Sequence, residues 1–243
     1  MVGTGTILNV LGITAGGLLG LGTGRFLTAR FQETVLKANA AAVVFIGISG
    51  AVSKMLTVSD SDPAKFGTKG TMMMILSLVL GAVLGEIIDL DSKFEAFGAW
   101  LKVRTGNSND KQFINGFVSA SLTVCIGAMA IVGSIQDGIY GDYSTLAAKA
   151  VLDFIIVMVM ASSMGKGCVF SAIPVGILQG SMTFLARLLQ PVMTTQALDN
   201  ISLVGSILIF LVGVNLFKPR TVRVANLLPA LIFAVIFAFV PGF

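Results

Sequence analysis

The stretch TMMMILSLVLGAVLGEII, residues 71–88, has a single charged side chain, Glu86, near its end. A helix that crosses the hydrocarbon core of a membrane needs about 20 predominantly apolar residues, and this stretch is close to that length. It is one of eight such segments, which lie at about residues 6–22, 38–56, 71–88, 113–134, 145–163, 167–187, 200–217 and 224–242. Eight crossings would use most of the chain, so we expect no sizeable soluble domain.

The composition leads to the same conclusion. Of the 243 residues, 55% are hydrophobic and 12% are charged, and the mean hydropathy is +0.93. Soluble domains carry about 25% charged residues, so the composition excludes an ordinary soluble globule and a disordered chain. We therefore predict an all-α fold, a polytopic transmembrane helix bundle that forms a single transmembrane domain over residues 1–243.

The positions of the lysines and arginines predict the orientation of this bundle. The four loops that follow the odd-numbered segments carry eleven of the 16 basic residues, Arg25 and Arg220 among them. Short cytoplasmic loops are rich in basic residues, so we expect these loops to be cytoplasmic and both termini to be external. The net charge of +4 then reflects topology, and we expect no nucleic-acid partner.

The longest of the cytoplasmic stretches, about residues 89–112, has an amphipathic pattern. Phe94, Phe97 and Leu101 fall on one face if the stretch is helical. Such a helix could lie on the membrane surface, and the alternative is a solvated loop.

Two parts of the chain resemble one another. Residues 3–9, GTGTILN, resemble residues 165–171, GKGCVFS, and the triplet that begins at Gly47 resembles the triplet that begins at Gly213. Combined with the predicted orientation, this indicates an inverted repeat, with repeat 1 at about 3–90, central helices at about 112–163 and repeat 2 at about 165–243. Inverted repeats are the plan of many secondary transporters, although a channel or a structural protein can also contain one.

The region between the fourth and fifth segments is rich in polar groups. Gln136, Asp137, Tyr140 and Asp142 supply oxygen ligands and hydrogen-bond donors, and three glycines in the same stretch interrupt the helical pattern. Broken helices that carry carboxylates can form cation or polar-solute sites in membrane proteins. The alternative is an ordinary external loop with turn residues.

Three further polar residues lie inside apolar segments, where charged groups are costly and often functional. Lys149 and Asp153 are four residues apart on one helical face. They form either an intrahelical ion pair or a site in which a coupling cation replaces the lysine. Gln179, near the centre of the sixth segment, could bind a solute or form a hydrogen bond between two helices.

The first segment has a glycine at every fourth position: Gly12, Gly16, Gly20 and Gly24. A stripe of small residues lets another helix approach closely. The partner helix lies either within the same chain or across a homodimer.

Several of these stretches resemble a family of bacterial membrane proteins, domain-of-unknown-function family 554. The resemblance rests on Gly5–Asn9 (GTILN), Gly16–Gly20 (GGLLG), Leu84–Glu86 (LGE), Gly133–Gly138 (GSIQDG) with Gly141, Asp142, Lys149 and Asp153, and Arg223–Pro229 (RVANLLP). It covers nearly the whole chain. It implies a multi-pass protein of the bacterial inner (cytoplasmic) membrane, of a kind often labelled as a candidate transporter.

We therefore predict a secondary transporter that moves a small polar solute or ion by alternating access, with one repeat rocking against the other, and with or without coupling to a cation. The alternatives are an ion channel and a non-transporting membrane scaffold or regulator. The chain has no histidine and no phosphate-binding or dinucleotide motif in a suitable context. We accordingly expect no enzyme activity, no cofactor and no metal site, and partners limited to the lipid bilayer, the solute or cation, and a second copy of the chain in a homodimer.

Overall fold

A computed structural model describes residues 2–24, 26, 28–59, 62–125, 128–218 and 221–241, so Arg25 and Arg220 of the predicted cytoplasmic loops lie outside the described residues. It is about 82% helical. The elements in chain order are α1 Thr4–Gly24, α2 Ala29–Met55, β1 Leu56–Ser59, β2 Asp62–Thr68, α3 Thr71–Ile88, α4 Leu90–Arg104, α5 Phe113–Cys125, α6 Ala128–Tyr140, α7 Ser144–Met164, η1 Lys166–Ser171, α8 Ala172–Phe184, α9 Ala186–Leu189, α10 Thr195–Phe217, η2 Val224–Leu227 and α11 Ala230–Phe237. The two strands pair antiparallel as one small hairpin.

Six helices in the described part of the chain are long and apolar enough to cross a membrane. They are Thr4–Gly24, Leu36–Met55, Thr71–Ile88, Ser144–Met164, Lys166–Phe184 and Thr195–Phe217. The helices Phe113–Cys125 and Met129–Tyr140 meet at a bend of 62° and would add a seventh crossing if they form one broken span. The last predicted segment contains only a shorter apolar helix, Val224–Phe237. The protein is therefore a helical membrane protein, and the count of eight crossings stays a prediction.

The fourth predicted segment differs most from the structure. We expected it to end near residue 134, with the glycines interrupting the helix. In the structure α6 continues to Tyr140, and the chain leaves the helix at Gly141, whose φ of 68° is left-handed. Gly133 and Gly138 lie inside α6, where an added Cβ would collide with Leu146 and with Thr183. These two glycines permit close packing, so the expected break at them is wrong.

Short local signals set other helix ends. The side chain of Thr28 accepts a hydrogen bond from the Phe31 N–H at the start of α2, and Thr194 accepts one from the Ala197 N–H at the start of α10. Threonine oxygens at this position satisfy backbone donors that have no partner inside the helix. These caps begin the two helices that cross each other in the second layer of the fold.

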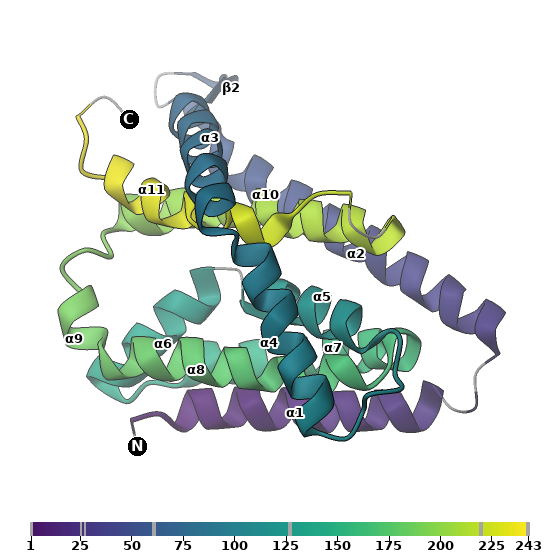
Figure 1. The fold of residues 1–243 in the computed structure, drawn as a ribbon. Helices are drawn as coiled ribbons and strands as arrows, with labels where there is room; N and C mark the ends of the chain where they lie inside the picture. Colours follow the sequence, from purple (N-terminus) through teal and green to yellow (C-terminus); the bar gives the residue numbers. More distant parts are fainter. Residues whose placement is uncertain are drawn as a thin grey trace.

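The helices form two layers (Figure 1). The first layer contains α1, α5, α6, α7, η1 and α8, in which α1 packs on α7 and α8, and α6 packs on α7 and α8. The second contains α2, α3, α10 and α11, in which α2 packs on α10 and α3 packs on α11. The layers meet where α2 contacts α7 and where α10 contacts α5 and α6. Figure 1 shows α4 passing from the end of α3 across to the first layer.

The glycine stripe of α1 lies against α7. A Cβ added at any of the four glycines would stand 2.9 Å or less from a backbone oxygen of α7: those of Ala150, Phe154, Met158 and Ser162, in that order. The residue numbers of the glycines and of the oxygens both increase in steps of four in the same direction. The two helices therefore run parallel and in close contact. The stripe is thus occupied within the chain. It gives no support to a homodimer, which stays a prediction.

A second close contact joins α2 and α10, and it is reciprocal. A Cβ on Gly47 would stand 2.5 Å from the Phe210 nitrogen, and a Cβ on Gly213 would stand 2.8 Å from the Val44 nitrogen. Gly47 and Gly213 begin the two similar triplets, and Val44 and Phe210 each lie three residues before them. The two helices therefore cross at equivalent points.

The amphipathic stretch after α3 is the helix α4, so a solvated loop is excluded for residues 90–104. Its aromatic face packs on α5: the ring centroids of Phe97 and Phe117 are 5.7 Å apart, and Leu101 joins Phe113 in the same apolar cluster. Protein rather than lipid therefore covers the face that we considered for the membrane surface.

Candidate functional site

Asp137 is the predicted site residue with the least ordinary surroundings. Its side chain has an exposed fraction of 0%. One carboxylate oxygen, Oδ2, accepts a hydrogen bond of 3.0 Å from the backbone N–H of Gly5, at the start of α1. The other oxygen, Oδ1, has no hydrogen-bond partner among the described residues. A buried carboxylate with an unpaired oxygen costs stability, so this position calls for a functional explanation.

The other members of the predicted polar stretch do not share this environment. The Gln136 amide oxygen accepts a hydrogen bond of 2.7 Å from the Thr145 hydroxyl, and Tyr140 is 71% exposed. Asp142 is exposed and accepts a hydrogen bond of 3.0 Å from the Ser144 N–H, which lowers the pKa of its carboxyl below the ordinary value. The structure therefore separates Asp137 from its neighbours in sequence.

Lys149 and Asp153 form a buried ion pair. The Lys149 Nζ lies 2.8 Å from Asp153 Oδ1 and 2.6 Å from Oδ2, and it donates a third hydrogen bond of 2.8 Å to the Val124 carbonyl at the end of α5. The ammonium group has only three donors, so this conformation uses all of them. The intrahelical ion pair is therefore present, and the replacement of the lysine by a coupling cation stays a prediction.

Gln179 lies in α8 with an exposed fraction of 1%, and neither end of its amide has a partner in the part of the chain that is described. Five buried side chains that the sequence did not single out also lack a hydrogen-bond partner there. One of them is Ser121 of α5. The other four, together with Asp137 and Gln179, form what we call the buried polar cluster: Thr6 and Asn9 of α1, Ser134 and Asp137 of α6, and Gln179 and Thr183 of α8.

Three contacts bring the members of the buried polar cluster together. The Gly5–Asp137 hydrogen bond joins α1 to α6. A Cβ on Gly138 would collide with the Thr183 carbonyl, which joins α6 to α8. A Cβ on Gly176 would stand 3.2 Å from Val10 Cγ2, which joins α8 to α1. Every residue in these contacts either belongs to the cluster, is adjacent in sequence to a cluster residue, or lies one helical turn from one. The segments of α1, α6 and α8 that carry the cluster residues therefore pack against one another in the first layer.

The cluster borders the buried ion pair through Asn9. This side chain interacts with the Asp153 carboxylate, although neither of its amide atoms makes a hydrogen bond within the described structure. Gly5 and Asn9 come from the first stretch on which the family resemblance rests, and Asp137 comes from the fourth. Only the packing of α1 against α6 and α7 could reveal that these stretches meet.

A polar cavity of about 440 Å³ lies between the two layers. Residues of α2, α4, α5, α7, α10 and η2 line it. Its polar groups include Asp91, Glu95, Asn115, Ser119, Asn215 and Arg223, and its apolar groups include Leu122, Val212 and Leu216. It lies at the end of the fold that the basic loops predict to be cytoplasmic. On α5, Leu122 is two residues before Val124, whose carbonyl binds Lys149.

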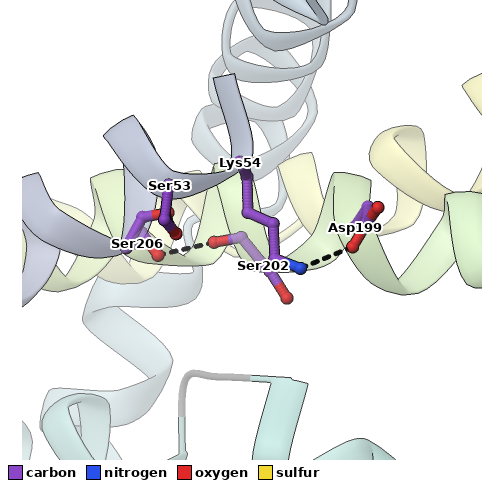
Figure 2. A network of polar contacts seen from close by, with 6 residues as sticks. Ser53, Lys54, Asp199, Ser202 and Ser206 are labelled. Carbon is purple, nitrogen blue, oxygen red and sulfur yellow. Dashed lines mark hydrogen bonds and ion pairs between the residues drawn. The ribbon is translucent and has the colours of Figure 1, made fainter. Parts of the chain in front are cut away.

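The opposite end of the α2–α10 pair is held together by an ion pair. Figure 2 shows Lys54, at the end of α2, reaching the Asp199 carboxylate near the start of α10, with Nζ and Oδ1 2.6 Å apart. Ser53, Ser202 and Ser206 lie beside it, and the Ser206 hydroxyl donates a hydrogen bond of 2.6 Å to the Ser202 carbonyl. The two helices are therefore linked at one end and line a cavity at the other.

Comparison with known proteins places the chain among membrane proteins. Residues 4–239 match the model of the family described as "Protein of unknown function (DUF554)". Uncharacterized membrane protein YdfK of Bacillus subtilis (strain 168) is 30% identical over 236 residues, which cover 97% of this chain and 96% of YdfK. Uncharacterized protein YqgA of Escherichia coli (strain K12) is 29% identical over 235 residues, which cover 95% of this chain and 94% of YqgA. No solved structure matches.

Proposed function

The chain belongs to the DUF554 family, and from this premise we propose that it is a secondary transporter that carries a small polar solute or ion across the membrane by alternating access. The observation that carries the proposal is the buried polar cluster. Polar groups inside a membrane protein are costly and are usually paired with one another or functional. Six buried side chains on three neighbouring helices each have a polar atom without a hydrogen-bond partner among the described residues, and they fit a site that is completed by a solute.

Two features support an alternating-access mechanism. The reciprocal contacts of Gly47 and Gly213 are those expected when α2 and α10 are related by an inverted repeat. The first helices of the two repeats also have similar roles, since α1 packs on α7 while η1 and α8 pack on α5 and α6. An inverted repeat of this kind supports two related conformations, each open to one side of the membrane.

The arrangement of the layers changes the motion that we propose. Each repeat contributes its first helix to the first layer and its other helices to the second. If one repeat rocked against the other, the helix contacts within both layers would have to break. We propose instead that the first layer moves against the second. The polar cavity between the layers and the Lys54–Asp199 pair at the other end of α2 and α10 fit a conformation that is open toward the predicted cytoplasmic side.

The remaining parts of the proposal follow from the same observations. We place the protein in the bacterial inner membrane, with the cavity facing the cytoplasm, and we propose that its partners are the lipid bilayer and the solute. The proposed activity involves no covalent chemistry and no cofactor. Coupling to a cation is proposed because Asp137 has an unpaired oxygen.

The test is transport by the purified protein in liposomes. Concentration jumps of Na⁺, K⁺, amino acids, amines and small sugars would be applied while charge movement is recorded on a solid-supported membrane, and uptake of labelled uncharged compounds would be measured in parallel. We expect saturable transport of at least one compound, its loss in Gln179→Leu, and its retention in Asp142→Asn, which changes an exposed carboxylate five residues from Asp137. Resolved unitary currents in a planar bilayer would favour the channel. Absence of any flux, together with a wild-type cell phenotype for Gln179→Leu, would favour the scaffold.

A further inference from the structure

We infer that the buried polar cluster binds a single monovalent alkali cation, that Asp137 is the carboxylate that holds it, and that Asp153 is not. This inference rests on the proposed function, because it names the class of ligand that the same site takes. It also excludes an anionic solute from the immediate surroundings of Asp137.

The charges in and around the buried polar cluster do not balance. Asp137 is the only formally charged member of the buried polar cluster. The other buried charges of the described residues, Lys149 and Asp153, neutralise one another at 2.6 Å. Helix α9 also packs against α6, but its Arg187 is exposed. The described residues thus leave one uncompensated negative charge in the cluster. An isolated buried charge is very costly, and one positive charge would compensate it.

The cluster also offers oxygen atoms that could bind a cation. Five buried groups have no hydrogen-bond partner in the described part of the chain: Asp137 Oδ1, the amide oxygens of Asn9 and Gln179, and the hydroxyls of Ser134 and Thr183. Carboxylate, amide and hydroxyl oxygens are the ligands of hard cations. The described residues contain no group of three or more acidic, cysteine or histidine side chains that could hold a metal ion. One carboxylate among neutral oxygens fits a monovalent ion better than a divalent one.

The two buried carboxylates differ in whether their oxygens are available to a cation. Both oxygens of Asp153 already contact the Lys149 ammonium, so a cation at Asp153 would have to displace a lysine that also binds Val124. Asp137 has one oxygen fixed by the Gly5 N–H and the other unpaired. The backbone bond orients the carboxylate and leaves Oδ1 available, which is the arrangement expected of a ligand.

The experiment measures thermal unfolding of the purified full-length protein in detergent with increasing NaCl, KCl or LiCl, using choline chloride to keep the ionic strength constant. A ligand that binds only the folded state raises the unfolding temperature in a concentration-dependent way. We expect a saturable increase with at least one alkali cation and none with choline. The increase should be absent in Asp137→Asn, and Gln179→Leu should weaken the apparent affinity by about tenfold or more. Asp142→Asn is the matched control and should behave as the wild type.

Two further variants keep the result interpretable. The double variant Lys149→Met with Asp153→Leu removes both charges of the ion pair and should retain the response to the cation. If Asp137→Asn does not fold, Gln179→Leu and Thr183→Val still test the site through their reduced affinity. Size-exclusion chromatography identifies the folded variants.

Three results would overturn the inference. The first is an unfolding temperature of the wild type that no alkali cation changes, and the second is an increase in Asp137→Asn equal to that of the wild type. The third is an unfolding temperature that responds to pH alone and loses this response in Asp137→Asn, which would mean that Asp137 binds a proton and not a cation. The proposed function can fail separately. Cation binding without flux of any solute would leave this inference intact and contradict transport. If the protein transports an uncharged or anionic solute, and neither alkali cations nor Asp137→Asn affect that transport, the proposed function stands and this inference is contradicted.

Discussion

Asp137 in α6 and Asp153 in α7 are two buried carboxylates of the same helix layer, yet their surroundings are opposite. Asp153 is neutralised by Lys149, one helical turn before it on the same helix. Among the described residues, Asp137 has one partner, a backbone N–H from another helix, and keeps one oxygen unpaired. The comparison shows that burial alone does not identify a binding residue, because what decides its role is which partners the fold supplies. The same substitution should therefore have opposite effects at the two positions.

The largest effect is expected for Asp153→Asn. Removing one partner of a buried ion pair leaves the other charge uncompensated and costs about 3–5 kcal/mol, so we expect a loss of this size in the free energy of unfolding. Lys149→Met with Asp153→Leu removes both charges and should recover most of it. Denaturant unfolding of the three proteins in detergent measures the difference, and an equal loss in the double variant would show that the pair acts by its packing and not by its charge.

Asp137→Asn should shift stability in the other direction. In buffer without alkali cations, the substitution removes a buried charge that lacks a partner, and the asparagine oxygen can still accept from the Gly5 N–H. We expect the free energy of unfolding to rise by about 1–3 kcal/mol. The same unfolding measurement tests this, with Asp142→Asn as the control. A loss of stability would mean that a group outside the described residues already compensates Asp137.

Asn9→Leu sharpens the comparison, because Asn9 interacts with Asp153 and lies one helical turn after Gly5, which binds Asp137. Its amide is buried without a hydrogen bond among the described residues, and leucine branches at the same carbon, so we expect a gain of about 1 kcal/mol in the free energy of unfolding. We also expect reduced transport in liposomes, since a residue retained at the expense of stability indicates function. Unchanged transport would remove Asn9 from the proposed site.

The smallest effect is expected for Asp142→Ala, since this carboxylate is exposed. The hydrogen bond from the Ser144 N–H lowers its pKa in the folded protein. Its contribution to stability is therefore present above the ordinary value of 3.8 and is lost as the pH falls through the lower folded-state pKa. Thermal unfolding between neutral and acidic pH should show a small advantage of the wild type that disappears in acid. An advantage that persists in acid would contradict a role for the carboxylate.

Sequence reasoning recovered part of the candidate site. Asp137 and Gln179 stood out as polar groups in or beside apolar segments, and the spacing of Lys149 and Asp153 predicted that they share a helical face. Thr6, Asn9, Ser134 and Thr183 were missed because each is an ordinary residue in its own helix. An asparagine or a hydroxyl in a membrane helix usually bonds to a neighbouring helix or to its own backbone, and only the positions of three helices show that these side chains have no such partner.

Local properties, namely hydropathy and the size of side chains at a fixed spacing, predict three features of this protein. These are its membrane character, its helical class and the close packing of the α1 glycines. These depend on one segment at a time, so the sequence by itself determines them. Other features depend on contacts between residues far apart in the chain. These are the partner of the glycine stripe, the continuation of α6 through two of its glycines, the contact between α4 and α5, and the hydrogen bond between Gly5 and Asp137. The tertiary structure alone decided them, because whether a buried polar group is paired depends on which other helices pack around it.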